Sequence, residues 1–229
     1  MTGGSVLFYG DPHGDWNPLF VAVCEHRPAA VVIVGDCGLD EPLREKLQPV
    51  WCLVKTWKWI PGNHDVDTES YYDFLFEDLP AGNLHGRYQV LGGLLVAGLG
   101  GIYKQKIWYP RLEGGDNVPV HETRQDFIRQ TSRAERWRGG LPRHARATIF
   151  PEDHAALKCL KVDVLVTHEA PTSHRHGFIG IDDLAKDMKL RLIVHGHHHT
   201  TYDGQTRDGI RVRGLGRAEP WLLTREALL

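Results

Sequence analysis

Five short segments of this sequence carry side chains that could bind metal ions. They are, in chain order, Asp11-Pro12-His13, Gly35-Asp36, Gly62-Asn63-His64-Asp65, Thr167-His168 and Gly196-His197-His198-His199. Carboxylate oxygens and imidazole nitrogens are ligands of Mn, Fe and Zn, whereas clustered cysteines would indicate structural zinc or an iron–sulfur cluster. No cysteine cluster accompanies these segments. The donor set therefore favours a site for divalent metal ions.

Each segment follows a run of apolar, mostly β-branched residues. The runs are Ser5–Tyr9, Val31–Val34, Trp57–Ile60, Val162–Val166 and Leu190–Val194. Such runs predict buried strands, and open α/β sheets bind ligands at the ends of their strands. Where the backbone stays extended, residues two apart face the same side. We therefore expect Asp11 with His13, and His197 with His199, to present paired donors, and His198 to point away.

A bridging carboxylate would let these segments bind two metal ions together. A carboxylate can bridge two cations about 3.5–4 Å apart, and such a pair can hold both a nucleophilic hydroxide and a phosphoryl oxygen. Asp36 is the natural bridge. Taken singly, an Asp or His at a strand end is more often a cap or a turn residue, and the tract from His195 to His199 could bind metal adventitiously. The prediction depends on all five segments occurring together.

The ordered set resembles the calcineurin-like metallophosphoesterases, whose pattern runs D-x-H, G-D, G-N-H-D/E, H and G-H-x-H. All five segments occur in that order between Asp11 and His199, so the resemblance covers nearly the whole chain. It implies a dinuclear metal-dependent phosphoester hydrolase, a phosphatase or phosphodiesterase, whose nucleophile is a hydroxide that spans the metals. For the two divalent metal ions we expect Mn, with Fe or Zn as alternatives.

Carried over position by position, the resemblance implies two metal positions that share one ligand. The first would be held by Asp11, His13, Asp36 and His199, and the second by Asp36, Asn63, His168 and His197. His64 would stabilise the transition state or protonate the leaving group, and Asp65 would orient His64. The stretch Val166–Pro171 also resembles the fourth motif of the family beyond its histidine.

The composition of the chain fits one catalytic domain over residues 1–229. With 229 residues, of which 41% are hydrophobic, it can bury a sizeable core. No apolar stretch approaches the roughly 18 residues that a membrane span needs. The N-terminal residues lack the basic region and apolar core of a signal peptide. The four cysteines have no disulfide-framework spacing, so we expect reduced thiols and a cytoplasmic protein.

Hydrophobic spacing predicts a mixed order of helices and strands. We expect helices over 16–26, 41–48 and 69–79, a hairpin over 88–91 and 94–99, and late strands over 205–206, 210–215 and 221–224. Helix-rich flanks around two groups of strands indicate an α/β fold, specifically the four-layer α/β/β/α sandwich of the metallophosphoesterase type. That architecture is also what the resemblance implies.

Residues 101–150 form a basic segment, which we interpret as an insertion or cap-like segment. They carry ten Lys or Arg residues against five acids, a formal charge of +5 that leaves −7 on the rest of the chain. A helix is expected over 122–137, with Arg129, Arg133 and Arg136 on one face. The interleaved Trp108, Tyr109 and Trp137 could stack on nucleic-acid bases or could form a small core of the segment itself.

The second motif departs from the Ser/Thr protein phosphatase branch of the family. That branch reads G-D-x-x-D-R-G, in which the arginine clamps the phosphate, whereas Asp40 here is followed by Glu41. Phosphoprotein substrates are therefore disfavoured unless an arginine of the segment 101–150 substitutes.

Three functions follow from these patterns. The first is a phosphatase or phosphodiesterase for a small or nucleotide-like phosphoester. The second is a metal-dependent nuclease that binds nucleic acid through the basic segment, for which no second DNA-binding module is recognisable. The third is a non-catalytic interaction protein of the same fold, which the intact His64 and seven candidate ligands disfavour. We favour the first.

Overall fold

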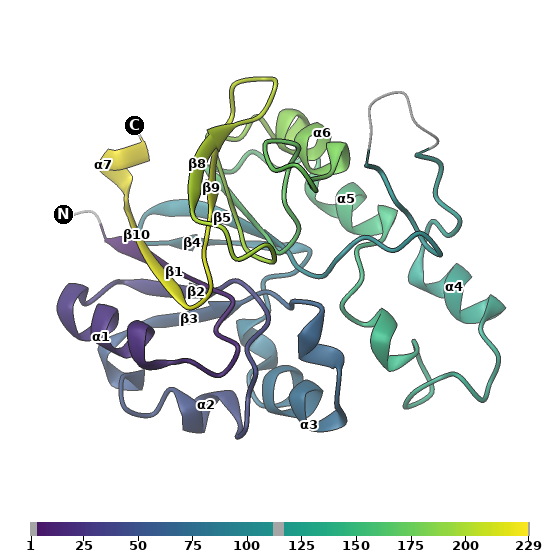
Figure 1. Cartoon of the computed structure of the whole chain (residues 1–229), viewed down its shortest axis with the longest axis horizontal. Coiled ribbons are helices and arrows are strands. Elements are labelled where there is room, and N and C mark those ends of the chain that lie inside the picture. The colour runs from purple at the N-terminus through teal and green to yellow at the C-terminus, as the bar shows by residue number, and fades with distance from the viewer. Residues whose placement is uncertain (1–3, 112–116, 229) are drawn as a thin grey trace.

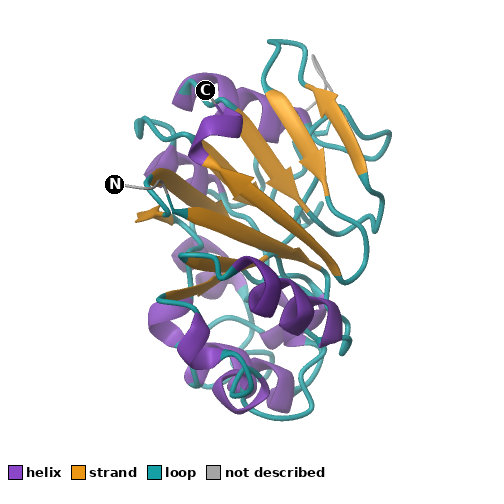
Figure 2. Ribbon diagram, turned by 90° about the vertical axis from the view of Figure 1, so that its left-hand side faces the viewer, coloured by secondary structure: helices purple, strands orange, loops and turns teal. Residues whose placement is uncertain are grey.

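Two β-sheets form the centre of the molecule. The structure, a computed structural model, describes residues 4–111 and 117–228. The smaller sheet has the order β10-β1-β2-β3, with β1 Ser5–Gly10, β2 Ala30–Ile33, β3 Thr56–Trp59 and β10 Glu219–Thr224. The larger sheet has the order β4-β5-β6-β7-β9-β8, with β4 Arg87–Leu91, β5 Leu94–Leu99, β6 Val164–Thr167, β7 Leu192–His195, β8 Tyr202–Gln205 and β9 Arg211–Gly214. The two sheets stack between flanking helices (Figure 2).

Three apolar cores separate four layers. In β1, Leu7 and Tyr9 face the core under the helices of the smaller sheet, whereas Val6 and Phe8 face the core between the sheets. In β6, Val166 faces the same central core, and the intervening Leu165 faces the helices of the larger sheet. Both of these strands thus bury two faces, which explains their nearly continuous apolar sequences. The predicted four-layer sandwich is confirmed.

Helices cover the outer face of each sheet. Beneath the smaller sheet lie α1 Asn17–His26, α2 Leu43–Lys46 and α3 Glu69–Tyr72, and α3 continues as a π-helical turn to Glu77. The larger sheet is covered by α5 Pro151–Leu157 and α6 Ile179–Met188, and α7 Arg225–Leu228 follows β10. The helices α1, α2 and α3 lie near the predicted positions, although α2 is shorter than expected, whereas the sequence patterns did not predict α5, α6 and α7. No helix among the described residues combines the length and apolarity that a membrane span requires.

The parallel strands bring the five motifs to one edge of the sandwich. β1, β2 and β3 are parallel in one sheet, and β5, β6 and β7 are parallel in the other. A backbone hydrogen bond of 2.9 Å from His13 N to Asp36 O joins the loops after β1 and β2. Another, from Gly101 N to Pro61 O, links the loops of the two sheets. The carboxyl ends of strands far apart in sequence therefore meet at one place.

The segment 101–150 contains less regular structure than the sequence predicts. Its one α-helix among the described residues is α4 Arg124–Gln130, which lies on the opposite side of the molecule from both termini (Figure 1). The prediction of a helix over 122–137 is wrong beyond Gln130, because Thr131 has extended backbone (φ −81°, ψ 130°). Arg133 and Arg136 therefore do not share a helical face with Arg129. Residues 112–116 of the segment lie outside the described residues.

Candidate metal centre

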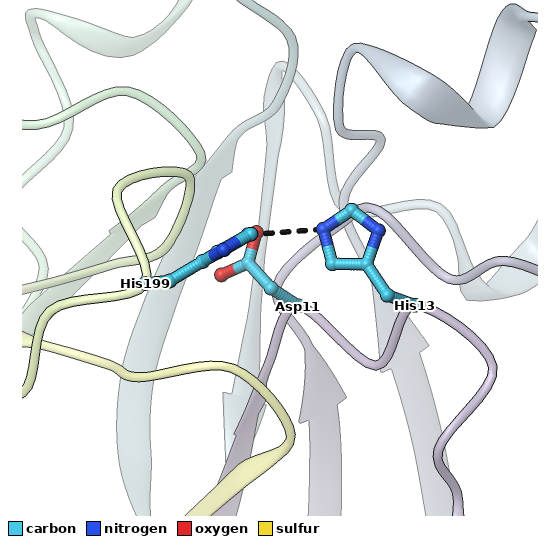
Figure 3. Close-up of side chains that lie close together, drawn as sticks. All are labelled: Asp11, His13 and His199. Atoms are coloured by element: carbon cyan, nitrogen blue, oxygen red, sulfur yellow. Dashed lines mark hydrogen bonds and ion pairs between the residues drawn. The ribbon is translucent and has the colours of Figure 1, made fainter.

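A first group of donor atoms lies where the loop after β1 meets the loop after β7. A carboxylate oxygen of Asp11 and ring nitrogens of His13 and His199 lie within 4.8 Å of one another. Nε2 of His13 and Nε2 of His199 are 2.9 Å apart. Figure 3 shows the two rings turned toward each other beside the Asp11 carboxylate. Two imidazole nitrogens bound to one zinc-sized ion would lie roughly 3 Å apart, so this pair is spaced to share one ion.

A second group of donor atoms combines Asp36, His168 and His197, again within 4.8 Å of one another. Nδ1 of the buried His168 lies 2.9 Å from the carbonyl oxygen of Val34 and donates its hydrogen there. Nε2 of His168 then faces Oδ2 of Asp36 at 3.4 Å and Oδ1 of Asn63 at 3.3 Å. The structure therefore brings the expected amide donor to this second group.

Oδ2 of Asp36 faces both groups. It lies 3.7 Å from Nε2 of His13 in the first group and 3.4 Å from Nε2 of His168 in the second. The other oxygen, Oδ1, accepts a hydrogen bond of 2.8 Å from the backbone N–H of His64. The backbone thus holds one oxygen in place while the other points at donors from both groups. A carboxylate that bridges two cations needs this arrangement.

Two motif glycines let the backbone approach the acidic side chains. A Cβ atom at Gly62 would collide with Oδ1 of Asp36, and one at Gly196 would collide with Oδ2 of Asp11. Directly after Gly196, the N–H of His197 donates to both Asp11 oxygens at 3.0 Å. The glycines of the third and fifth segments therefore position the carboxylates rather than contribute atoms of their own.

Five of the candidate ligands have left-handed backbone. The φ angles are 40° at Asp11, 42° at His13, 50° at Asp36, 69° at His197 and 49° at His199. A non-glycine residue in this region costs about 1–2 kcal/mol, and such strain concentrates at functional sites. The expectation of extended backbone is therefore wrong. Because the chain turns at each ligand, His197 and His199 separate into different groups instead of presenting paired donors.

The centre holds buried carboxylates that pair with histidines but with no Lys or Arg of the described residues. Burial raises the pKa of Asp11 to about 7, against the opposing charge of His168, and burial with the Asp36 charge raises the pKa of Asp65 to about 6. Burial lowers the pKa of His168, but Asp36 more than reverses this and raises it to about 10. Within residues 4–111 and 117–228, no Lys or Arg pairs with these three carboxylates.

Buried anionic groups are stable only when a cation or several hydrogen bonds compensate them. The same pocket also presents uncharged imidazoles, since burial lowers the pKa of His197 to about 3. Neutral imidazoles and carboxylates are the donor forms that metal ions require. The residues present therefore fit divalent metal ions.

His64 is oriented by a different acid from the one expected. Nδ1 of His64 lies 2.6 Å from Oδ2 of Asp67, and both side chains are about half exposed. The carboxylate of Asp65 is buried and accepts backbone hydrogen bonds of 2.9, 2.7 and 2.8 Å from Asp36, Cys37 and Gly62. The expected contact between Asp65 and His64 is therefore wrong.

The helical turn His64–Val66 supplies the reason. Residues three apart share a face of such a turn, whereas adjacent residues diverge. Asp67 therefore lies beside the imidazole, and Asp65 points into the protein, where it holds the loop that carries Asp36. The spacing of three residues after His64 was the signal in the sequence that could have identified Asp67.

The remaining histidines of the tract have separate surroundings. His198 belongs to neither of the two groups above, but its ring nitrogen lies within 4.8 Å of donors from Glu169 and His197. Its ring stacks on His174 with centroids 4.0 Å apart. His195 is buried, and its Nε2 lies 2.8 Å from the hydroxyl of Tyr202.

Arg217 is a basic residue at the centre that the sequence patterns missed. Its Nη2 donates to the carbonyl oxygen of His13 at 3.5 Å. The next residue, Ala218, donates its N–H to the carbonyl oxygen of Asp11 at 3.1 Å. The loop between β9 and β10 thus holds an arginine beside the first donor group. No motif in the sequence marks this position.

Several arginines of the segment 101–150 are paired within the molecule. Arg124 contacts both oxygens of Asp153 at 2.8 Å, and Arg138 contacts Asp73 at 2.6 and 2.9 Å. These two guanidinium groups therefore stabilise the packing of the segment against α5 and α3.

The aromatic residues of the segment are also packed. The ring of Trp137 lies 4.8 Å from that of Tyr72, and the ring of Trp108 lies 5.4 Å from that of Tyr103. The position of Trp108 agrees with the alternative of a small core within the segment, whereas Trp137 packs against α3, and neither position supports stacking on bases.

With this geometry in view, the comparisons with known proteins decide the family. The sequence matches the calcineurin-like phosphoesterases over residues 4–201. The chain belongs to this family. As a calcineurin-like phosphoesterase, it is a metal-dependent phosphoester hydrolase. The resemblance seen in the five motifs is therefore confirmed.

The relatives agree with this assignment. A Haemophilus influenzae protein described as uncharacterized is 34% identical over 212 residues, which span 92% of this chain and 90% of that protein. A crystal structure from Thermus thermophilus aligns with a TM-score of 0.57 at 14% identity, covering 97% of this chain and 99% of the other. A dimetal phosphatase from Danio rerio aligns with a TM-score of 0.53 at 11% identity, covering 95% and 88%. The two structures share the fold of this phosphoesterase.

Proposed function

We propose that this phosphoesterase binds two divalent metal ions and hydrolyses a small or nucleotide-like phosphomonoester or phosphodiester. Asp11, His13, Asp36 and His199 would hold the first ion, and Asp36, Asn63, His168 and His197 the second. The observation that carries the proposal is the position of Asp36 Oδ2, which faces His13 at 3.7 Å and His168 at 3.4 Å. The similar fold of a dimetal phosphatase from Danio rerio supports two ions, and we predict that they are Mn.

When bound, two such ions supply Lewis acidity, which lowers the pKa of water and neutralises charge on phosphoryl oxygens. The side chains around them have separate tasks. His64 reaches the solvent side of the centre and would donate a proton to the departing oxygen. Asp67 holds Nδ1 of that ring at 2.6 Å, so that Nε2 is left to act. Asp65 keeps the Asp36 loop in place.

Arg217 would bind the phosphate that is cleaved. Its guanidinium lies beside His13 on the exposed side of the first donor group. A guanidinium can bind two phosphate oxygens at once, which is the task of the arginine that is missing after Asp40. The anchoring of Ala218 to Asp11 would keep this arginine at the centre without help from the segment 101–150.

Metal content tests the bridging role most directly. Asp36→Asn should lose both ions, because each donor group loses a shared ligand, whereas His13→Ala should weaken mainly one. Metal per protein is measured after loading with Mn(II) and dialysis, and hydrolysis of aryl phosphomonoesters and phosphodiesters is measured on the same samples. We expect hydrolysis by the wild-type protein to fall by several orders of magnitude in Asp36→Asn, since metal ions contribute several kcal/mol to the transition state.

A matched control separates ligand loss from unfolding. Asp40→Asn removes one carboxylate from the same loop, at an exposed position that pairs with Lys46, and should retain both ions. Two tightly held ions in Asp36→Asn would refute the dinuclear assignment. Loss of both ions in Asp40→Asn as well would show that the loop, rather than the bridge, was disturbed.

A further inference from the structure

Two adjoining cavities lie beside the candidate metal centre. The first, of about 570 Å³, is lined by Ser173, His174, Arg175, His176, His198 and Tyr202, among others. The second, of about 370 Å³, shares His174 and Arg175 with the first and adds Arg111, Thr172 and Arg207. Because they share part of their lining, we refer to the two cavities together as the basic groove. It extends from the His198 loop to the start of α6.

The basic groove is positively charged in a chain whose net charge is negative. Three arginines and three histidines line it, and no acidic residue is among the described residues that do so. The guanidinium groups of Arg111 and Arg175 make no hydrogen bond or ion pair with any part of the chain that the structure describes. Behind the wall, Asp182 is buried and accepts from the backbone N–H of Thr172 at 2.9 Å. Burial raises the pKa of Glu169, and the charge of Arg111 acts on this carboxyl to lower it. Within the described residues, both guanidinium groups are therefore available to hydrogen-bond a ligand.

The groove begins at the metal centre. His198 links the two, because its ring lies 4.7 Å from that of His197 and 4.0 Å from that of His174, measured between centroids. Nε2 of His198 is buried and has no hydrogen-bond partner among the described residues. A ligand at the second donor group could therefore continue past His198 into the groove.

The walls of the groove are held rigidly. The loop that carries His174 and Arg175 is closed by backbone hydrogen bonds of 3.0 Å from His174 N to Pro171 O and 2.8 Å from Gly177 N to His174 O. On the floor, the hydroxyl of Tyr202 contacts Nε2 of His195 at 2.8 Å and the hydroxyl of Ser173 at 3.0 Å.

The hydrogen-bond donors on this floor can be assigned. Nδ1 of His195 donates to the carbonyl oxygen of Gly196 at 2.9 Å. Nε2 of the neutral ring therefore accepts from Tyr202. The Tyr202 oxygen accepts in turn from Ser173. Groups fixed in this way lose little entropy when they bind a ligand.

We propose that the basic groove binds a second phosphate of the substrate, carried by the leaving group, while the first phosphate is cleaved at the metal centre. This inference rests on the proposed function and narrows it to phosphoesters with two separated phosphate groups. Arg175 and Arg111 would contact the second phosphate, since guanidinium groups bind phosphate through paired, charge-assisted hydrogen bonds. His174 and His176 would add ring N–H donors along the way.

Selectivity between matched substrates tests the proposal. A series of linear diol bisphosphates of increasing length is compared with the corresponding diol monophosphates, using the Mn(II)-loaded protein. We expect a higher kcat/KM for bisphosphates above a threshold length. In Arg175→Gln, the ratio of kcat/KM for the bisphosphate to that for the monophosphate should fall about tenfold to hundredfold, because charge-assisted hydrogen bonds contribute roughly 1.5–3 kcal/mol.

A control variant keeps the change in charge but leaves the groove intact. Arg191→Gln removes an exposed arginine at the amino end of β7, away from the metal centre at its carboxyl end. In this variant, the ratio of kcat/KM for the bisphosphate to that for the monophosphate should equal the ratio of the wild-type protein. Equal ratios in wild-type protein, Arg175→Gln and Arg111→Gln would overturn the proposal, as would the absence of any preference for bisphosphates.

A binding measurement separates failure of the groove from failure of the proposed function. Inorganic tripolyphosphate is titrated into metal-free protein by calorimetry, and the ring signals of His174 and His176 are followed by NMR. We expect binding that shifts both signals and weakens about tenfold or more in Arg175→Gln, but not in Arg191→Gln. If the protein hydrolyses no phosphoester yet binds in this way, the groove stands and the hydrolytic site fails. If the protein hydrolyses aryl esters but Arg175→Gln leaves the affinity for tripolyphosphate unchanged, the proposed phosphate site in the groove is refuted.

Discussion

The acidic side chains of the candidate metal centre and the basic side chains of the segment 101–150 differ in how they pair with residues of opposite charge. At the centre, Asp11, Asp36 and Asp65 are buried, and none of them pairs with Lys or Arg in the described parts of the chain. In the segment, Arg124 and Arg138 each contact an acid of a neighbouring element at less than 3 Å. The acids of the centre are therefore available to bind metal ions. The two arginines of the segment are instead neutralised by acids of the protein itself.

The backbone conformation also differs between the two regions. Left-handed φ angles occur at five candidate ligands, whereas within the described part of 101–150 Arg138 is the non-glycine residue with a positive φ. Strain of this kind persists only where the surrounding structure enforces it. Arg138 combines such a backbone with a side chain paired to Asp73, so strain alone does not indicate a functional residue. The comparison teaches that strain does so when it occurs together with buried acids that pair with no Lys or Arg. The predictions that follow test this contrast, in order of decreasing effect.

The largest effect is expected at His64. If its ring protonates the departing oxygen, His64→Ala should keep both ions but lose roughly 10²–10⁴ in kcat on alkyl phosphoesters, the usual range for general acid catalysis. The loss should shrink for a nitrophenolate leaving group, which needs no proton. Asp67→Asn should show the same pattern at roughly 10–100-fold, because it acts through the ring. Kinetics on both ester types and metal analysis check this.

Asp65→Asn serves as the contrasting variant. It leaves the His64–Asp67 contact untouched and weakens the backbone hydrogen bonds that hold the Asp36 loop, so it should lower metal affinity rather than change the leaving-group dependence. A leaving-group effect in Asp65→Asn but not in Asp67→Asn would restore Asp65 as the acid that orients His64.

The next effect concerns stability in the segment. Asp153→Asn removes the more buried of the two carboxylates that Arg124 contacts, the other being Glu152 at 2.7 Å, and this carboxylate also accepts from the backbone N–H of Phe150 at 2.8 Å. We expect the free energy of unfolding to fall by roughly 1.5–3 kcal/mol, the value for a hydrogen bond to a charged group. The loss stays below that for a buried pair because Arg124 keeps Glu152 and 30% of its side chain is exposed. Urea denaturation measures this. Metal content of the folded variant should be unchanged, and a loss of bound metal would contradict the separation of the two regions.

Acid should also destabilise the packing under the segment. The ring of His154 packs against those of Tyr103 and Trp108, its Nε2 lies 2.7 Å from the Tyr103 hydroxyl, and burial lowers its pKa from 6.5 to about 4. Between those pH values the unfolded chain binds the extra proton, so stability is complete above pH 6.5 and falls as the pH drops toward 4, by about 3 kcal/mol. Denaturation of metal-free protein across this range is the measurement. His154→Gln should show a shallower pH dependence, and an equal slope in both proteins would assign the acid sensitivity elsewhere.

The smallest effect tests the strain at the centre. His199 has a φ of 49°, which glycine adopts without penalty. His199→Gly should therefore leave metal-free protein about 1 kcal/mol more stable than His199→Ala, which loses the same ligand but keeps the strained backbone. Thermal or urea unfolding of the two variants, without metal, gives the difference. Equal stability would mean that the loop relaxes once the ligand is gone.

The sequence by itself determined which residues could meet. The apolar runs before each motif bury both faces, as Leu7 and Phe8 of β1 do, and this pattern alone predicts parallel strands whose ends converge. Residue types then limited the chemistry, because carboxylates and imidazoles without clustered cysteines favour catalytic divalent ions. Together with the resemblance of the five motifs to the calcineurin-like family, these patterns predicted the family and the four-layer fold.

Only the tertiary structure decided how those residues face one another. Contacts between segments far apart in the sequence decide three features of the site. These are the left-handed backbone at His197 and His199, the orientation of the His64–Asp67 pair toward the centre, and the position of Arg217, which lies on a loop without a motif. Periodicity describes the regular elements, whereas a ligand loop takes the conformation that its distant neighbours impose, such as the hydrogen bonds from His197 to Asp11. For the same reason, the basic groove could not be predicted: Arg111, Arg175 and Arg207 come together only when the chain is folded.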